Sequence, residues 1–212
     1  MSYKFKNHIK NNPYLTTMVS EEHKFIYMKT GRTASTAIFN ILKSKNVVEV
    51  SRPYFFNNGT NHWLENITDE EIKNDYFVFT FVRNPFDRLV SAWKPFTKKR
   101  PPKVKLNFSN FVKKRGVGCL LYEDGSFTND HWFPQSKYVE FDNGEKFVNF
   151  VGRFENINED WKIIANQYGL SKILPHSNKS NHKHYKKYYT NDLIEITSTI
   201  YQKDLEIFNY EF

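Results

Sequence analysis

The chain has 212 residues, 39% of them hydrophobic, and a formal net charge of +8 at pH 7. This length suits one domain with a sizeable core, and the composition excludes a disordered tail. Its one cysteine, Cys119, excludes an intrachain disulfide and a thiolate metal cluster. The charge favours anionic partners, but it does not distinguish nucleic acid, nucleotides, acidic polysaccharide and lipid head groups.

The sequence shows no targeting or membrane segment. The first residues, MSYKFKNHIKNNPYL, have neither the apolar core nor the cleavage site of a signal peptide. No window is apolar for long enough to cross a bilayer. We therefore expect a cytoplasmic protein with no transmembrane segment. We expect residues 1–212 to form a single domain, with an N-terminal extension at 1–22 and a motif-bearing core at 23–212.

Short apolar runs alternate with helical patterns along the chain. Strands are predicted at 24–28, 47–50, 76–82 and 146–154. The near-continuous apolar run YFVFTFV at 76–82 is typical of a central parallel strand. Helices are predicted from Thr33, over 67–75, from Asn84, near 108–115, from Asn156 and from about Asn191. This alternation predicts an α/β fold, a three-layer αβα arrangement around a mainly parallel sheet.

Three of these helices have predicted N-caps. Thr68 with Glu71, and Asn156 with Glu159, have the spacing of a capping box. Asn84 precedes Pro85, which suits the first helical position.

The first candidate site is the loop KTGRTAST at 29–36, between a predicted strand and a predicted helix. Such a turn forms an anion site, because unpaired main-chain N–H groups and the helix dipole point at the ligand. Gly31 is expected to permit the tight turn. Hydroxyl donors and positive charges for phosphate or sulfate oxygens are supplied by Thr33, Ser35, Thr36, Lys29 and Arg32.

This loop differs from that of an ATPase, which reads G-x-x-x-x-G-K-[ST]. Here Lys29 precedes the only glycine of the loop, and no predicted strand ends in an Asp well placed for Mg²⁺. An ordinary polar turn between a strand and a helix is the alternative for this loop taken alone.

A second loop makes the pattern more specific. Together, KTGRTAST and FTFVRNPFDRLVSAW (79–93) resemble the paired cofactor-binding motifs of sulfotransferases, most closely the carbohydrate branch with the chondroitin and heparan sulfate enzymes. The later segments HWFPQSKYV, VGRFENINEDW and LPHSNKSNHKHYKKYY resemble the same branch in the same order. The resemblance runs from about residue 24 to the C-terminus and implies the P-loop-like sulfotransferase fold.

The donor of that family is 3′-phosphoadenosine 5′-phosphosulfate (PAPS), and no metal is required. The resemblance implies that the 5′-phosphosulfate is held by Lys29, Thr30, Gly31, Arg32, Thr33, Ala34, Ser35 and Thr36. It implies that Arg83 and Ser91 hold the 3′-phosphate, for which the planar guanidinium of arginine is well suited. Arg88, on the same predicted helix, is expected to pair with a carboxylate instead.

Sulfuryl transfer needs charge stabilisation on the leaving oxygen and a base for the acceptor hydroxyl. Lys29 is the candidate for the first role. For the second, heparan sulfate 2-O-sulfotransferases carry their base histidine just before a short helix and the central strand, which makes His62 the candidate. His131 and Glu65 are the alternatives.

Other residues have less specific expectations. His131, Lys179 and Ser180 are possible residues of a cofactor or acceptor loop, and the basic stretch at 176–187 could equally be a solvated surface. Gln135 is expected to shape the acceptor pocket. The basic runs at 98–105 and 113–115 would attract a polyanionic glycan or remain solvated.

The predicted function is sulfuryl transfer from PAPS to a hydroxyl of a carbohydrate. Two alternatives stay open: a P-loop-like small-molecule kinase, and a basic nucleic-acid-binding protein without catalysis. Many eukaryotic relatives have an N-terminal membrane anchor, and this sequence shows none, so we expect either a bacterial or viral setting or a truncated form of a longer protein.

Overall fold

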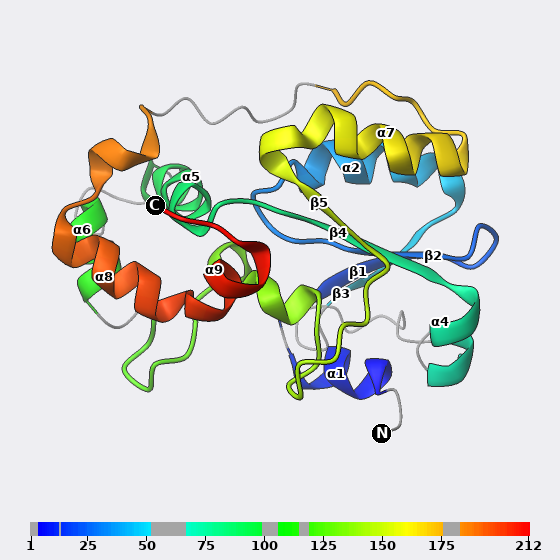
Figure 1. Cartoon of the computed structure of the whole chain (residues 1–212), viewed down its shortest axis with the longest axis horizontal. Coiled ribbons are helices and arrows are strands. Elements are labelled where there is room, and N and C mark those ends of the chain that lie inside the picture. Colours follow the sequence, from blue (N-terminus) through cyan, green and yellow to red (C-terminus); the bar gives the residue numbers. More distant parts are fainter. Residues whose placement is uncertain (1–3, 13, 52–66, 99–105, 115–118, 176–182) are drawn as a thin grey trace. The chain divides into compact units, whose positions relative to one another are not determined.

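The structure is a computed structural model that describes residues 4–12, 14–51, 67–98, 106–114, 119–175 and 183–212 (Figure 1). The chain divides into two compact units. Unit 1 comprises residues 1–82 and 137–177, and unit 2 comprises residues 83–136 and 178–212. No described helix is long and apolar enough to cross a membrane.

Within the described residues, unit 1 is built on a five-stranded sheet of order β3-β1-β2-β4-β5. The strands are β1 (Thr16–Ser20), β2 (Phe25–Met28), β3 (Val48–Ser51), β4 (Phe77–Val82) and β5 (Phe150–Arg153). β2, β4 and β5 pair in parallel, whereas β1 is antiparallel to both of its neighbours. Four of the five strands therefore point the same way, which confirms the predicted α/β fold with a mainly parallel sheet.

The chain enters this sheet earlier than the sequence pattern indicates. Helix α1 (Phe5–Asn11) and strand β1 both lie within residues 1–22. The five residues of β1, TTMVS, are all buried although three of them are polar. Their main chain pairs on both sides, and the Ser20 hydroxyl donates to the carbonyl oxygen of Lys45 at 2.8 Å. These partners allow a polar segment to be an inner strand.

Helices cover both faces of the sheet in unit 1. Helices α2 (Ser35–Leu42) and α7 (Ile157–Tyr168) lie on one side, and α1 and α4 (Asp69–Asp75) lie on the other (Figure 1). Under α2 and α7, Tyr27, Phe79, Phe81 and Trp161 form an aromatic core. A side chain at Gly152 of β5 would meet the Phe81 ring at 2.3 Å, so this core requires the glycine.

Two predicted capping boxes have different outcomes. At α4 the box forms: the Glu71 N–H donates to the Thr68 hydroxyl at 3.1 Å, and the Thr68 N–H donates to the Glu71 carboxylate at 2.7 Å. At α7 the prediction is wrong, because Asn156 makes no side-chain cap and instead donates to Asp160 at 2.7 Å. A 3-10 turn, η5 (Phe154–Asn156), leads directly into α7, and Asn156 has φ −119° and ψ 28° rather than the extended conformation of a capping residue.

Unit 2 is mainly helical in its described part. It contains α5 (Pro85–Lys98), α6 (Phe108–Lys113), η3 (Asp130–Trp132), η6 (Tyr185–Tyr188), α8 (Asn191–Ile200) and α9 (Gln202–Phe208), and η4 (Gln135–Tyr138) begins in it. A second core gathers Phe111, Trp132, Leu193 and Tyr201. The single helix predicted from Asn191 breaks at Tyr201, whose hydroxyl donates to the Trp132 carbonyl oxygen at 2.5 Å.

Candidate functional site

The loop after β2 turns into α2 through left-handed residues. Arg32 and Ala34 have φ angles of 69° and 60°, so two non-glycine residues of this loop take the uncommon left-handed conformation. That Gly31 permits the tight turn stays a prediction. Left-handed residues in a turn are typical of main-chain anion-binding concavities. Ala34 is the N-cap of α2, and no side chain caps this helix among the described residues.

Two threonines of this loop, Thr30 and Thr33, are fully buried, and their hydroxyl groups make hydrogen bonds that hold the loop in its conformation. The Thr80 hydroxyl on β4 donates to the Met28 carbonyl oxygen at 2.7 Å, so the Thr30 hydroxyl, 2.9 Å away, must donate to Thr80. The Thr33 hydroxyl donates back to the Thr30 carbonyl oxygen at 2.8 Å. The hydroxyls of Ser35, half-buried, and Thr36, exposed, are therefore better placed than these two for a ligand.

The positive charges of the first loop lie nearer the surface. Lys29 and Arg32 are both half-buried. The Lys29 ammonium lies 4.8 Å from the centre of the Phe39 ring on α2, and that of Lys43 lies 4.3 Å from the same ring. Cations are attracted to the faces of aromatic rings, so Phe39 helps to orient the Lys29 side chain beside α2.

Tyr27, on β2 just before the loop, has a buried hydroxyl. Thr33 lies beside it, yet the Tyr27 hydroxyl has no hydrogen bond of good geometry in the part of the chain that the structure describes. Burial raises the pKa of Tyr27 well above its usual value. The hydroxyl is thus a neutral polar group within the core beneath the loop.

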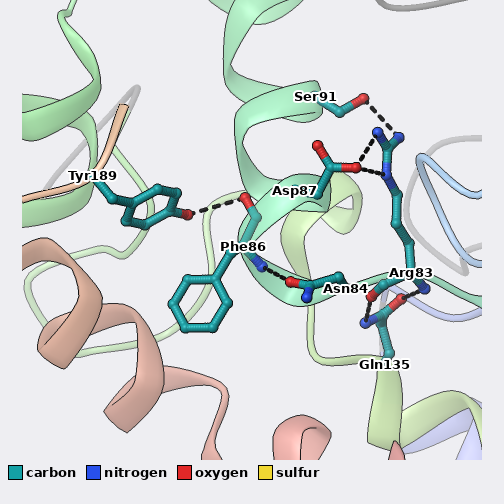
Figure 2. A network of polar contacts seen from close by, with 7 residues as sticks. All are labelled: Arg83, Asn84, Phe86, Asp87, Ser91, Gln135 and Tyr189. Atoms are coloured by element: carbon teal, nitrogen blue, oxygen red, sulfur yellow. Dashed lines mark hydrogen bonds and ion pairs between the residues drawn. The ribbon is translucent and has the colours of Figure 1, made fainter. Parts of the chain in front are cut away.

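The second loop centres on Arg83, the residue after β4 (Figure 2). Its Nε and Nη2 atoms donate to the Asp87 carboxylate at 2.9 and 2.7 Å, and Nη1 donates to the Ser91 hydroxyl at 3.2 Å. Only 5% of Arg83 and 1% of Ser91 are exposed. The structure thus brings together the two residues expected at the second loop, and it adds Asp87, which sequence reasoning missed despite its i, i+4 spacing from Arg83.

The main chain of Arg83 is bonded by a side chain from a distant segment. Gln135 Oε1 accepts from the Arg83 N–H, and Gln135 Nε2 donates to the Arg83 carbonyl oxygen, both at 2.8 Å (Figure 2). In turn the Asp204 carboxylate on α9 accepts from the main-chain N–H groups of Gln135 and Ser136 at 2.7 and 2.8 Å. No local pattern in the sequence indicates this buried chain of contacts.

The start of α5 has the side-chain cap that was predicted at Asn84. The Asn84 side-chain oxygen accepts from the Phe86 N–H at 3.0 Å, and the Tyr189 hydroxyl donates to the Phe86 carbonyl oxygen at 3.1 Å (Figure 2). Burial raises the pKa of Tyr189, so its hydroxyl stays a neutral donor. The helix start beside Arg83 is therefore fixed by side chains of unit 2.

Arg88 is buried within unit 2. It is 1% exposed and donates to the carbonyl oxygen of Phe133 at 2.8 Å. Its charge also acts on the buried Asp204 carboxylate, where it opposes the effect of burial on the pKa, in keeping with the expected pairing with a carboxylate. Arg88 therefore has a structural role within unit 2.

The remaining candidates are described only in part. His62, Glu65, His176, Lys179, Ser180 and His182 lie outside the described residues, as does most of the basic run at 98–105. His131 lies in η3 with its side chain 50% exposed, 3.9 Å from the Asp130 carboxylate. Gln135 is fully buried and bonded to Arg83, which does not fit a residue lining an acceptor pocket.

Comparison with known proteins identifies the chain. The family model described as the sulfotransferase family matches residues 15–211, which include both loops and β1. The chain belongs to the sulfotransferase family. The predicted resemblance is thereby confirmed.

The relatives of this sulfotransferase are distant. It is 23% identical to carbohydrate sulfotransferase 10 of Xenopus laevis over 237 residues, which cover 91% of this chain and 66% of the relative. It is 24% identical to carbohydrate sulfotransferase 14 of Danio rerio over 182 residues, which cover 72% of this chain and 48% of the relative. An uncharacterised protein of Archaeoglobus fulgidus is 29% identical over 112 residues, 52% of this chain and 82% of the relative. No solved structure gives a match.

The sulfotransferase therefore spans about half to two thirds of the length of the two carbohydrate sulfotransferases that it matches. Its two loops follow β2 and β4, which are neighbouring parallel strands of the sheet. Ligands of α/β sheets bind beyond the carboxyl ends of such strands, and this is where each loop begins.

Proposed function

We propose that this sulfotransferase transfers the sulfuryl group of PAPS to a hydroxyl of a carbohydrate. The observation that carries the proposal is the arrangement of Arg83, a buried guanidinium held beside the Ser91 hydroxyl by the carboxylate of Asp87. A planar guanidinium with a neighbouring hydroxyl donor suits a terminal phosphate. The names of the relatives support a carbohydrate acceptor.

In this proposal Arg83 and Ser91 bind the 3′-phosphate of the donor, which an ordinary adenine nucleotide lacks. The protein itself orients Arg83, because its guanidinium is bonded to Asp87 and its main chain to Gln135. Pre-ordering of this kind reduces the entropy lost on binding and favours a nucleotide with the additional phosphate.

The first loop binds the 5′-phosphosulfate in the same proposal. The uncapped N-terminus of α2 offers main-chain N–H groups and the positive end of the helix dipole. Ser35 and Thr36 add hydroxyl donors, while Thr30 and Thr33 keep the loop in shape. Lys29 stabilises the charge that develops on the leaving oxygen, which is the largest electrostatic demand of an in-line transfer.

A histidine accepts the proton of the acceptor hydroxyl in this mechanism. We propose His62 for this role on the resemblance alone, since it lies outside the described residues. His131 is the alternative base, and its half-exposed side chain is accessible to solvent.

The described relatives come from two vertebrates and an archaeon and do not support the expected bacterial or viral setting. That setting stays a prediction, together with the cytoplasmic location.

Calorimetric titration tests the donor site. The wild type, Arg83→Ala and a control, Lys203→Ala, are titrated with 3′-phosphoadenosine 5′-phosphate (PAP), adenosine 5′-monophosphate (AMP) and ATP with Mg²⁺. Lys203 is exposed on α9, so the control removes the same charge from a solvated position. Wild type and control should prefer PAP, and Arg83→Ala should lose at least about tenfold in PAP affinity while AMP binding stays unchanged.

The opposite results are equally informative. Equal binding of PAP and AMP by the wild type, or a preference for ATP with Mg²⁺, would contradict the proposal.

For the acceptor, transfer of radiolabelled sulfate from PAPS to a panel of glycans should be lost in Lys29→Ala. Transfer that persists at the wild-type rate in that variant would exclude the proposed role of Lys29.

A further inference from the structure

The side chain of Gln135 bonds to the main-chain N–H and C=O groups of Arg83, as a neighbouring strand would. β4 ends at Val82, so the peptide groups of Arg83 lie beyond the ladder that β4 forms in unit 1. Buried main-chain N–H and C=O groups need partners, because an unpaired group loses its hydration without compensation. Gln135 supplies both partners at 2.8 Å, and Gln135 itself is 0% exposed.

The orientation of the Gln135 amide is determined by its surroundings. The Arg83 N–H requires an acceptor and the Arg83 carbonyl oxygen requires a donor, so Oε1 and Nε2 cannot be exchanged. Nε2 also lies 3.5 Å from the Asp204 carboxylate, where an amide oxygen would be repelled. The amide has therefore one satisfactory orientation.

Asp204 holds Gln135 from the other side. The carboxylate is fully buried in α9 and accepts the consecutive main-chain N–H groups of residues 135 and 136 at 2.7 and 2.8 Å. Arg88 provides a nearby positive charge for this carboxylate. Asp204 of α9, the first two residues of η4 and Arg83, which precedes α5, are thus connected by short polar contacts within unit 2.

From this geometry we infer that Gln135 is a positioning residue that gives Arg83 its selectivity for a 3′-phosphate, an inference that rests on the proposed function. Asp87 and Ser91 hold only the tip of the Arg83 side chain. Gln135 fixes the other end, the main chain from which the side chain departs. An arginine fixed at both ends presents its guanidinium in one place, whereas one fixed only at its tip follows any shift of the main chain.

The test compares three variants by their affinities for PAP and AMP. Gln135→Met keeps the size of the side chain and removes both hydrogen bonds to Arg83. Gln135→Glu keeps the acceptor for the Arg83 N–H but turns a negative oxygen toward the Arg83 carbonyl oxygen and Asp204. Gln202→Met is the matched control, because Gln202 is exposed on α9, where its side-chain amide donates to the Glu206 carboxylate at 2.8 Å.

The measured quantity is the ratio of AMP to PAP dissociation constants. Gln135→Met and Gln135→Glu should lower this ratio about tenfold through PAP alone, with AMP affinity changed by less than about twofold. Gln202→Met should keep the wild-type ratio. Thermal unfolding of each variant is recorded alongside, because loss of buried hydrogen bonds also lowers stability.

The two proposals fail in different ways. A wild type that does not prefer PAP would overturn the proposed function. A wild type that prefers PAP, with a Gln135→Met variant that melts earlier but keeps the full preference, would overturn the positioning role and leave a purely structural one. Should the methionine variant not fold, the ratio in Gln135→Glu decides between the same two outcomes.

Discussion

Asp87 lies one helical turn after Arg83, and a single oxygen of its carboxylate accepts from both Nε and Nη2 of that arginine. This i, i+4 pair leaves 6% of the Arg83 side chain and 21% of the Asp87 side chain exposed. A carboxylate thus occupies one edge of the guanidinium. The pair both neutralises the buried charge of the guanidinium and fixes the orientation of that group.

Asp87→Asn should therefore lower the free energy of unfolding by about 1–3 kcal/mol, because the buried guanidinium loses its charged partner. Sulfate should restore more stability to this variant than to the wild type, since the anion can replace the missing carboxylate. The measurement is thermal unfolding in sodium sulfate and in sodium chloride of equal ionic strength. Asp142→Asn, which breaks the exposed pair with Lys137, is the control and should cost at most about 1 kcal/mol. An identical sulfate response in both variants would count against the prediction.

The hydroxyl of Tyr27 should be dispensable for stability. Because it makes no good hydrogen bond to the described residues, Tyr27→Phe should change the free energy of unfolding by less than about 0.5 kcal/mol, or raise it. Tyr138→Phe is the matched comparison: its hydroxyl donates to the Tyr14 carbonyl oxygen at 3.0 Å, and its loss should cost about 1 kcal/mol. Urea unfolding of the two variants decides, and an equal cost at both positions would refute the expectation.

The left-handed conformation of Ala34 should make this position tolerant of glycine. Ala34 has φ 60° and ψ 18°, which glycine adopts without the steric penalty of a Cβ atom. Ala34→Gly should therefore be close to neutral, whereas Ala37→Gly, inside the same helix and buried, should cost about 1–2 kcal/mol. Denaturant midpoints measure both. If Ala34→Gly proves as costly as Ala37→Gly, the turn does not have this conformation in solution.

His8 should make unit 1 sensitive to acid. It is buried between the rings of Phe141 and Phe147, and its Nε2 donates to the Lys137 carbonyl oxygen at 2.7 Å. Burial lowers the pKa of His8 below 6.5, against smaller opposing effects of that hydrogen bond and of Asp142. The folded state therefore binds this proton more weakly than the unfolded chain does. The stability from His8 is complete above pH 6.5 and decreases as the pH falls toward the lowered pKa.

His8→Gln keeps a donor for the Lys137 carbonyl oxygen and removes the titration. The free energy of unfolding of the wild type should fall relative to this variant between about pH 7 and pH 5, where an ordinary histidine gains its proton. Parallel profiles for wild type and His8→Gln would show that His8 does not contribute to the acid response.

The parts of the fold that could be predicted depend on neighbours in the sequence. Thr68 and Glu71 form their capping box, and Asn84 caps α5, because the signals for a helix start lie within a few consecutive positions. The alternation of strands and helices likewise predicts the α/β class. In each case a few consecutive side chains supply the whole signal.

The parts that could not be predicted depend on distant partners. Strand β1 has no apolar alternation, and only its pairing with β2 and β3 explains why buried threonines and a serine form a strand. Gln135 meets Arg83 from 52 positions away, and Asp204 meets Gln135 from 69 positions away. Nothing near Asp204 in the sequence indicates the two main-chain N–H groups that donate to its carboxylate.

The side-chain amide of Gln135 bonds to main-chain atoms of residue 83, so these contacts do not depend on which side chain residue 83 carries. Anchoring and ligand recognition are thus separate properties at one position. A lineage could exchange Arg83 for another side chain, and so change the anion that is recognised, without rebuilding the support beneath it. The same separation makes position 83 a suitable site for directed evolution of altered donor preference, with Gln135 and Asp204 left untouched.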